Sequence, residues 1–324
     1  MKKLITILLL AFLPIVANAD AIEVDGIWYK FISDSQTVEV TPNPKYYTGE
    51  VIIPDKVSYG GTDYSVITIG EGAFEGCSGL ISVIIPNSVT IIGERAFAFC
   101  GDLTSVIIPN SVTQIGGYAF NYCTGLTSIS LPNSVTSIEE GTFMGCGNLT
   151  SVTIPNSVTS IGEKAFSWCW YLSSVNIPNS VTSIGKEAFY YCPNLTSATI
   201  GNGITWIDQQ SFDYCESLTD IYCKAEKVPQ TPRYLYSSIT STPEIITLHV
   251  PVGCVKAYKD VSPWNLFKEI VEIEEDTCIK QLSLDNQLSP IDYFTIEGMR
   301  IAQPQQGLNI IRSKDGTVKK VLIK

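Results

Sequence analysis

The chain repeats itself every 23 residues through most of its length. One proline marks each period: Pro86, Pro109, Pro132, Pro155 and Pro178. An Ala-Phe pair, a cysteine and a leucine recur at the same interval, so the unit reads C-x-x-L-T-S-V-x-I-P-x-S-V-T-x-I-G-x-x-A-F-x-x. A unit of this size cannot bury its apolar residues alone, whereas stacked units bury them against one another. The period therefore predicts a solenoid.

The local pattern within one unit predicts short strands and tight turns. In the segment LTSVIIP, Val106 and Ile108 alternate with exposed positions, which is typical of a strand with one buried face. Pro109 ends this strand because proline has no N–H to donate to a sheet. Gly116 permits a sharp bend, and the following YAFNYC has apolar residues at helical spacing for about one turn. We expect each coil to combine parallel strands, turns and a one-turn helix.

The repeat closely resembles the BspA-type leucine-rich repeat of bacterial surface proteins, which is marked by Ala-Phe-x-x-Cys-x-x-Leu-x-x-Val/Ile-x-Ile-Pro. The resemblance covers residues 54–224 in seven copies, the first of them stretched by about nine residues. Residues 20–53 resemble the amino-terminal cap hairpin of the same proteins, and residues 225–274 resemble their closing cap. Caps cover the open strands at the two ends of a solenoid. The expected fold is a leucine-rich repeat solenoid with β-rich caps.

The first 19 residues read as an export signal. Two lysines precede an apolar run of about 13 residues, and the segment ends in the small-x-small sequence Ala17-Asn18-Ala19. This run is too short to span a bilayer, and no second one follows. We therefore expect cleavage near Ala19, a secreted or outer-surface location, and no transmembrane segment.

The carboxy-terminal residues follow a different pattern. After a polar linker at 275–290, residues 291–324 contain three short alternating segments separated by glycine turns, which predict a small β-domain. This tail resembles the sorting domain of the type IX secretion pathway, although Leu308-Asn309 replaces the aromatic residue usual after its glycine. An ordinary β-domain that completes the fold is the alternative.

Seven of the ten cysteines occupy one repeat position: Cys77, Cys100, Cys123, Cys146, Cys169, Cys192 and Cys215. An exported protein with an even cysteine count permits disulfides. However, stacked equivalents have parallel Cβ vectors, and a tetrahedral metal site needs convergent ligands. We interpret the column as buried free thiols. Outside the column, Cys223 and Cys254 could pair in the closing cap.

The residue inventory argues against several functions. A formal net charge of −11 disfavours binding to nucleic acid. The single histidine, His249, lies in an apolar run without a nucleophile elbow, so a structural role is favoured over general-base catalysis. The sequence shows no phosphate loop and no histidine-containing metal motif. We expect no enzyme, cofactor or metal; an enzyme would require carboxylates clustered in a cleft.

Two sets of residues are candidates for binding a partner. The first lies two residues after a constant serine on the strand face, the usual binding face of such solenoids, and varies between copies: Ile84, Ile107, Ser130, Thr153, Asn176 and Thr199. The second is aromatic and lies around the cysteine column: Trp168, Trp170, Tyr171, Tyr191 and Tyr214. Such rings supply contact area at a low entropic cost. The plain alternatives are surface variation for the first set and cover for the helical edge for the second.

The resemblance implies a non-enzymatic adhesin that binds extracellular proteins, such as matrix or cell-surface components of a host or neighbouring cell. Physical reasoning alone supports only an extended and exposed interaction scaffold. The runner-up is a glycan-binding surface protein that uses the aromatic edge.

Overall fold

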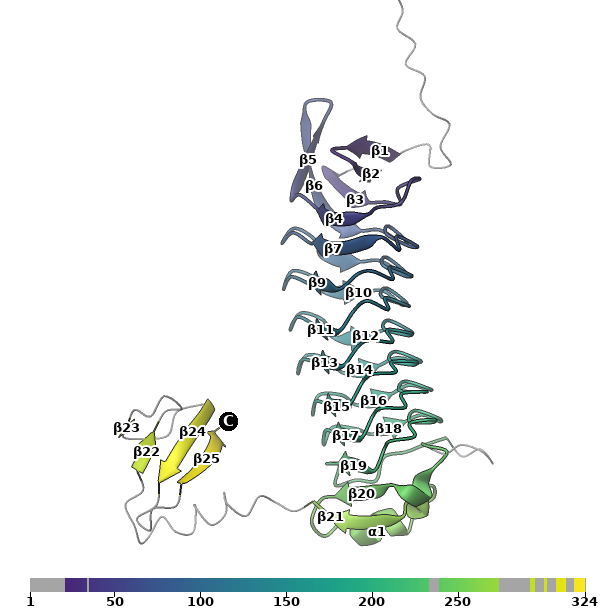
Figure 1. Cartoon of the computed structure of the whole chain (residues 1–324), viewed down its shortest axis with the longest axis vertical. Coiled ribbons are helices and arrows are strands. Elements are labelled where there is room, and N and C mark those ends of the chain that lie inside the picture. The colour runs from purple at the N-terminus through teal and green to yellow at the C-terminus, as the bar shows by residue number, and fades with distance from the viewer. Residues whose placement is uncertain are drawn as a thin grey trace, which may run out of the picture. The chain divides into compact units, whose positions relative to one another are not determined.

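The structure is a computed structural model that divides into two compact units, Met1–Ile273 and Glu274–Lys324. It describes residues 21–33, 35–232, 239–273, 292–294, 300–301, 307–312 and 318–323. The expected signal peptide and the linker lie outside these residues. The first unit is a stack of coils, as Figure 1 shows. The leucine-rich repeat solenoid that the period predicts is confirmed.

One side of the stack carries the strands of the LTSVxIP segments, which pair in parallel with their neighbours. We call this side the strand face. Its strands are β4 (Gly49–Ile52), β7 (Leu80–Ile84), β9 (Ser105–Ile107), β11 (Ser128–Ser130), β13 (Ser151–Thr153), β15 (Ser174–Ile177), β17 (Ser197–Ile200), β19 (Asp220–Cys223), β20 (Thr247–Val250) and β21 (Glu269–Glu272). Every pairing between adjacent repeats joins equivalent positions, so each column of the sequence becomes a row of side chains along the stack.

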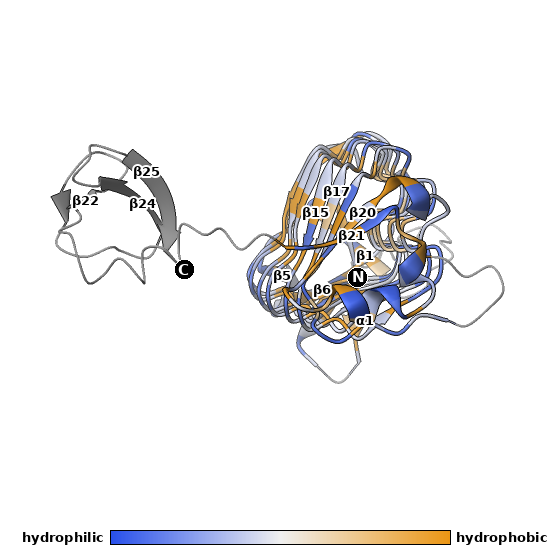
Figure 2. Cartoon of the chain, turned by 90° about the horizontal axis from the view of Figure 1, so that it is seen from below, coloured by the Kyte–Doolittle hydropathy of each residue, from blue (hydrophilic) through white to orange (hydrophobic). Residues whose placement is uncertain are grey.

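A second side is built from strands that are two residues long in most coils and lie at the x-I of the S-V-T-x-I segment. They pair in parallel in two groups. The first is β3 (Thr37–Val40), β6 (Thr62–Ile69), β8 (Ile91–Ile92) and β10 (Gln114–Ile115), and the second is β12 (Ser137–Ile138), β14 (Ser160–Ile161), β16 (Ser183–Ile184) and β18 (Trp206–Ile207). Seen along the stack in Figure 2, successive coils lie one behind another.

The third side, which we call the turn side, corrects one detail of the expectation. The Ala-Phe-x-x-Cys segments in the described coils are runs of turns instead of one-turn helices. In one coil the Ala96 N–H donates to the Gly93 carbonyl within the coil, at 3.3 Å, but the Phe97 N–H donates to Ala119 of the next coil, at 2.7 Å. An α-helix would keep all of these bonds within one segment. Residues with left-handed backbone, such as Arg95 at φ 52°, also interrupt a helical path.

The core is formed by columns of repeated side chains. Phenylalanines of consecutive coils stack nearly parallel, with centroids 5.0–5.5 Å apart: Phe74, Phe97, Phe120, Phe143, Phe166, Phe189 and Phe212. All of these rings are fully buried, as are the repeat leucines from Leu80 to Leu218. Burial of this many apolar groups is the main favourable term that holds one coil to the next.

Separate elements close each end of the solenoid. Strands β1 (Ala21–Val24) and β2 (Ile27–Ile32) form an antiparallel sheet with β3. The extra residues of the first repeat form a hairpin between β5 (Lys56–Tyr59) and β6. The far end contains the 3₁₀ turns η1 (Pro243–Ile245) and η2 (Trp264–Leu266) and the helix α1 (Val255–Lys259). The fully buried Trp264 packs edge-on against Tyr258, with ring centroids 5.3 Å apart.

The second unit contains an antiparallel sheet in the order β23–β22–β24–β25. Its strands are β22 (Asp292–Phe294), β23 (Arg300–Ile301), β24 (Gly307–Arg312) and β25 (Val318–Ile323). The alternating segments of the tail predict such a sheet. Its role in sorting stays a prediction.

Candidate interaction surfaces

The cysteine column carries no accessible chemistry. All seven thiols are free and buried, and from Cys100 onward each contacts the carbonyl of the phenylalanine 26 residues earlier, as Cys146 does with Phe120 at 3.1 Å. Burial raises the pKa of Cys146 to about 12, so the reactive thiolate is suppressed at neutral pH. The interpretation as buried free thiols is confirmed.

The two cysteines suspected of pairing are also free. The Cys223 thiol lies 3.3 Å from the Tyr258 hydroxyl, and the Cys254 thiol lies 3.6 Å from the Glu226 carbonyl. Each thiol therefore has its own polar neighbour within the closing cap.

The single histidine is held in a local cluster on the strand face. The His249 Nε2 lies 2.8 Å from an Asp220 carboxylate oxygen, and its ring stacks on Tyr222 with centroids 4.1 Å apart. The hydrogen bond with His249 lowers the pKa of Asp220, as does a second hydrogen bond from Thr219. These contacts fix the ring in place. Among the described residues, no group of three or more His, Cys, Asp or Glu side chains could hold a metal ion.

The strand-face candidates form one exposed row, as the repeat predicts. Pairs from adjacent strands stand in register, including Ile84 with Ile107 and Asn176 with Thr199. Ser130, Thr153 and Asn176 are exposed and Thr199 is half-buried. The two isoleucines are exposed by 57% and 80% and pair with each other, so they form a small contiguous apolar patch.

This row extends beyond the residues found from the sequence. It continues to Ile52, which is 66% exposed and pairs with Ile84, and at the other end to Tyr222 and His249. Tyr222 lies 23 residues after Thr199, so the period of the sequence could have identified it. The insertion after Ile52 and the longer connection before His249 shift those two residues out of phase.

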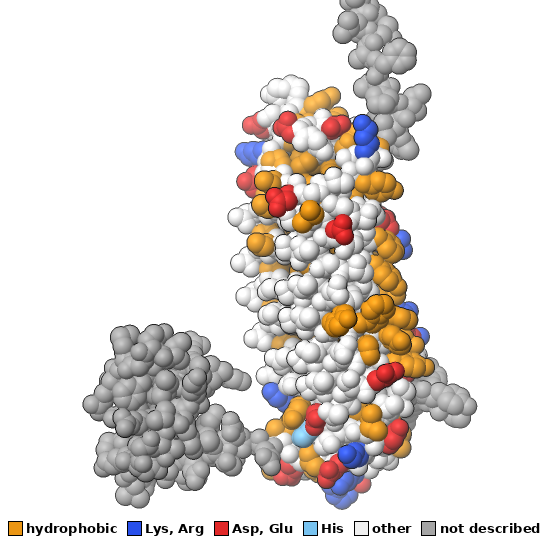
Figure 3. All heavy atoms as spheres, viewed as in Figure 1, with side chains coloured by type: hydrophobic (Ala, Val, Ile, Leu, Met, Phe, Trp, Pro, Cys, Tyr) orange, Lys and Arg blue, Asp and Glu red, His pale blue; other side chains and the backbone are white. Residues whose placement is uncertain are grey.

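The aromatic candidates separate into two groups. Trp168 stacks on Tyr191 at 4.4 Å, and Tyr191 lies 6.1 Å from Tyr214, so these three rings form one column on the turn side. Trp170 and Tyr171 stand outside this column and are 48% and 56% exposed. In Figure 3 hydrophobic side chains form a stripe along one edge of the stack. The stacked rings cover one another's faces and act partly as structure.

The aromatic column has an unusual backbone that the sequence does not reveal. Its three residues and the equivalent residues of two earlier coils have left-handed backbone conformations, with φ between 54° and 63° at Phe99, Tyr122, Trp168, Tyr191 and Tyr214. A non-glycine residue there costs on the order of 1 kcal/mol or more. Hydrogen bonds to the next coil hold this conformation, for example from the Trp168 N–H to the Tyr190 carbonyl at 2.8 Å. Phe99, which was not among the candidates, stacks on Tyr122 at 5.4 Å.

The described part of the chain contains no helix that is long and apolar enough to cross a bilayer. Comparison with curated proteins gives no match. The chain is similar to the solved structure of a leucine rich cell surface protein from Faecalibacterium prausnitzii A2-165, with 22% identity, coverage of 80% of this chain and 96% of that one, and a TM-score of 0.48.

Two further structures are similar. The T. pallidum Leucine Rich Repeat protein is 27% identical, with coverage of 63% of this chain and 82% of that one and a TM-score of 0.44. A leucine-rich repeat protein from Bacteroides ovatus is 26% identical, with coverage of 79% and 80% and a TM-score of 0.34.

The family model for the BspA type leucine rich repeat region matches in six copies, over residues 61–170 and 136–251. Together these matches span more than half of the chain. The coils within them carry the stacked phenylalanines and buried cysteines described above. The chain therefore belongs to the BspA-type leucine-rich repeat family.

Proposed function

We propose that the protein is an exported interaction scaffold at a bacterial surface, and that its strand face binds an extracellular protein of a host or neighbouring cell. The observation that carries this proposal is the exposed apolar end of the strand-face row. Ile52, Ile84 and Ile107 pair in register there and stand largely in solvent. Contiguous exposed apolar side chains commonly mark interaction sites.

The geometry of the strand face supports recognition of an extended surface. Each coil contributes one variable side chain to the row, at roughly the 4.8 Å spacing of paired strands. The row changes from apolar at Ile84 and Ile107 to polar at Ser130 and Thr153. A partner that lies along the stack would meet this graded sequence of contacts.

The test is a screen of the purified full chain against arrays of extracellular matrix proteins and glycans. An Ile84→Thr/Ile107→Thr variant should bind its array partner about tenfold more weakly, because two apolar contacts at a hot spot are lost. Threonine already occupies this position at Thr153 and Thr199, so the fold should be retained. The matched control is Ile91→Thr, an exposed isoleucine on the second side. Silence on both arrays would refute the adhesin proposal.

Glycan binding is a second candidate because Trp170 and Tyr171 are exposed and stand outside the stacked column. Exposed rings can pack against the apolar faces of sugars. A Trp170→Ala/Tyr171→Ala variant should then lose glycan binding while protein binding stays unchanged. The opposite pattern would leave the strand face as the site.

Export and sorting belong to the same proposal. The Lys-Lys start, apolar run and Ala17-Asn18-Ala19 site support removal of residues 1–19, and the tail sequence supports sorting by residues 291–324. Mass spectrometry of the surface and medium fractions of an expressing bacterium should find a mature chain that begins near Asp20. A full-length chain retained inside the cell would contradict this.

A further inference from the structure

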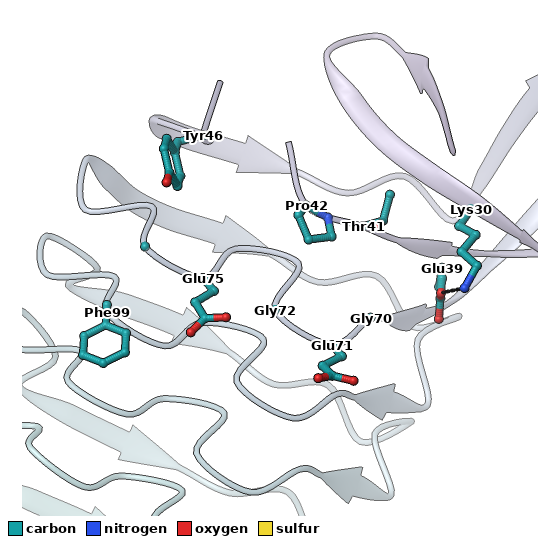
Figure 4. Close-up of a pocket in the computed structure, with 11 residues that line it drawn as sticks. Lys30, Glu39, Thr41, Pro42, Tyr46, Gly70, Glu71, Gly72, Glu75 and Phe99 are labelled. Carbon is teal, nitrogen blue, oxygen red and sulfur yellow. Dashed lines mark ion pairs between the residues drawn. The ribbon is translucent and has the colours of Figure 1, made fainter. Parts of the chain in front are cut away.

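A hollow of about 800 Å³ lies where the amino-terminal cap meets the first coil of the turn side (Figure 4). Lys30, Glu39 and Tyr46 line it from the cap and the following loop. The first coil contributes Gly70, Glu71, Gly72, Glu75 and Gly76 to the lining, and the next coil contributes Phe99.

The hollow exists because the first coil has glycine at both left-handed positions of its turn segment. Gly72 and Gly76 have φ values of 60° and 73°, where the next coil carries Arg95 and Phe99. No side chain of the first coil therefore extends over the turn side from these two positions.

A second coil with the same pair of glycines has no such space. Gly141 and Gly145 are covered by Tyr118 and Tyr122 of the preceding coil, and a Cβ atom added at Gly145 would stand 2.7 Å from the Tyr122 ring. The first coil is preceded by the cap instead of another coil. Tyr46 comes near Gly76, with a ring carbon 3.4 Å from where a Cβ atom of Gly76 would lie, but it does not meet Gly76 as closely as Tyr122 meets Gly145.

The lining combines two exposed rings with carboxylates. Phe99 has Tyr122 stacked on one face, while the equivalent position on its other side is Gly76, which offers no ring. Tyr46 is 60% exposed at the opposite end. An aromatic face next to open space attracts a cation.

The carboxylates differ in how far they are neutralised. Glu39 pairs with Lys30 at 3.5 Å, and Glu75 pairs with Arg95 at 3.6 Å. Within the described part of the chain, Glu71 has no ion-pair partner. The lining thus contains three carboxylates and one lysine. Of the three carboxylates, Glu71 is available to pair with the charge of a ligand.

We propose that this hollow binds an arginine or lysine side chain of a partner protein. The cationic group pairs with Glu71, and next to it Glu75, while the methylene stem packs against Tyr46 and Phe99. Carboxylates on an open surface would be solvated by water and would bind a cation only weakly. Here the space between the two exposed rings also gives the methylene stem of the ligand a surface to pack against. The ligand rests on the proposed function, but the site lies on the turn side and is separate from the strand face.

The test uses saturation-transfer NMR on the full chain with three probes: acetylated and amidated Gly-Gly-Arg-Gly-Gly, its lysine analogue, and its neutral citrulline analogue. The arginine and lysine peptides should receive saturation that weakens with added salt, because screening reduces the ion pair. The citrulline peptide should bind at least tenfold more weakly. Equal signals from arginine and citrulline would overturn the proposal.

Two variants locate the binding. Glu71→Gln should weaken arginine-peptide binding about tenfold, whereas the matched exposed control Glu216→Gln should not change it. Gly76→Phe should abolish binding by filling the hollow, and the column accepts aromatic residues with this backbone at Phe99 and Trp168. Circular dichroism and melting checks that each variant folds. Unchanged binding by folded Glu71→Gln and Gly76→Phe refutes the site.

The two proposals can fail separately. Ile84→Thr/Ile107→Thr should leave the arginine-peptide signal intact. A chain that binds this peptide but no array protein keeps the cationic site and refutes the proposed function. A chain that binds an array protein but no cationic peptide refutes the site alone.

Discussion

The strand face and the turn side belong to the same coils but use their variable residues differently. On the strand face, Ile107 is 80% exposed. On the turn side, equally variable positions hold rings that contact the next coil, as Trp168 contacts Tyr191. Variation between repeats therefore does not identify a binding residue by itself. The deciding observation is whether a neighbouring coil already uses the side chain.

The backbone explains this difference. Side chains on a strand stand perpendicular to the sheet, so a row on the strand face points away from the stack. Left-handed turn residues place their rings against the neighbouring coil, as Tyr122 lies against Gly145 and Trp168 against Tyr191. The turn side is thus partly a structural element, and the hollow described above lies where the column of rings is interrupted next to the cap.

The largest expected effect is a difference in the free energy of unfolding between a buried residue behind the turn side and an exposed residue of the strand face. Phe143→Ala should lower the free energy of unfolding by about 3–5 kcal/mol, because it removes a fully buried ring stacked between Phe120 and Phe166. Ile107→Ala should change it by less than about 0.5 kcal/mol. Urea unfolding followed by circular dichroism measures both. Similar losses for the two variants would remove the distinction between the sides.

A smaller effect tests the packing of rings over glycines. Gly145→Ala should cost about 1–3 kcal/mol, because its Cβ atom would meet the Tyr122 ring at 2.7 Å and its backbone stays left-handed. Gly253→Ala is the matched control, since Gly253 has a similar φ of 82° and nothing within 4 Å of an added Cβ atom. Part of the cost at Gly145 should disappear in a Tyr122→Ala background. Additive effects in a double-mutant cycle would contradict the contact.

The smallest effect concerns the cluster of Asp220, Tyr222 and His249, where side chains of the strand face contact those of neighbouring strands. The pKa of Asp220 is lowered in the folded chain, so its contribution to stability is present above the ordinary value near 3.9 and is lost as pH falls through the lowered pKa. Asp220→Asn should flatten the dependence of the unfolding midpoint on pH in this acidic range. Unfolding titrations of both proteins at several pH values measure the change. Identical profiles would show that the carboxylate contributes nothing.

The sequence predicts the repeating parts of the molecule well, because a period specifies which residues stack. It identifies the solenoid, the buried cysteines and the in-register row from Ile84 to Thr199. It does not reveal the left-handed backbone, since Arg95 and Trp168 occupy conformations that are usually marked by glycine. The expected helical turn is wrong for the same reason. The hollow depends on the junction between cap and coil, where the period gives no information.

The parallel stacking of equivalent residues has a consequence for how such a chain can change over time. Every inner coil contacts neighbours that resemble it, so gain or loss of one complete unit leaves the new junction chemically similar to the old one. Length is then adjustable in steps of roughly one strand spacing, about 4.8 Å, without redesign of either cap. A gene for such a protein can alter its reach by unequal recombination, while the cap hollow stays attached to the same first coil.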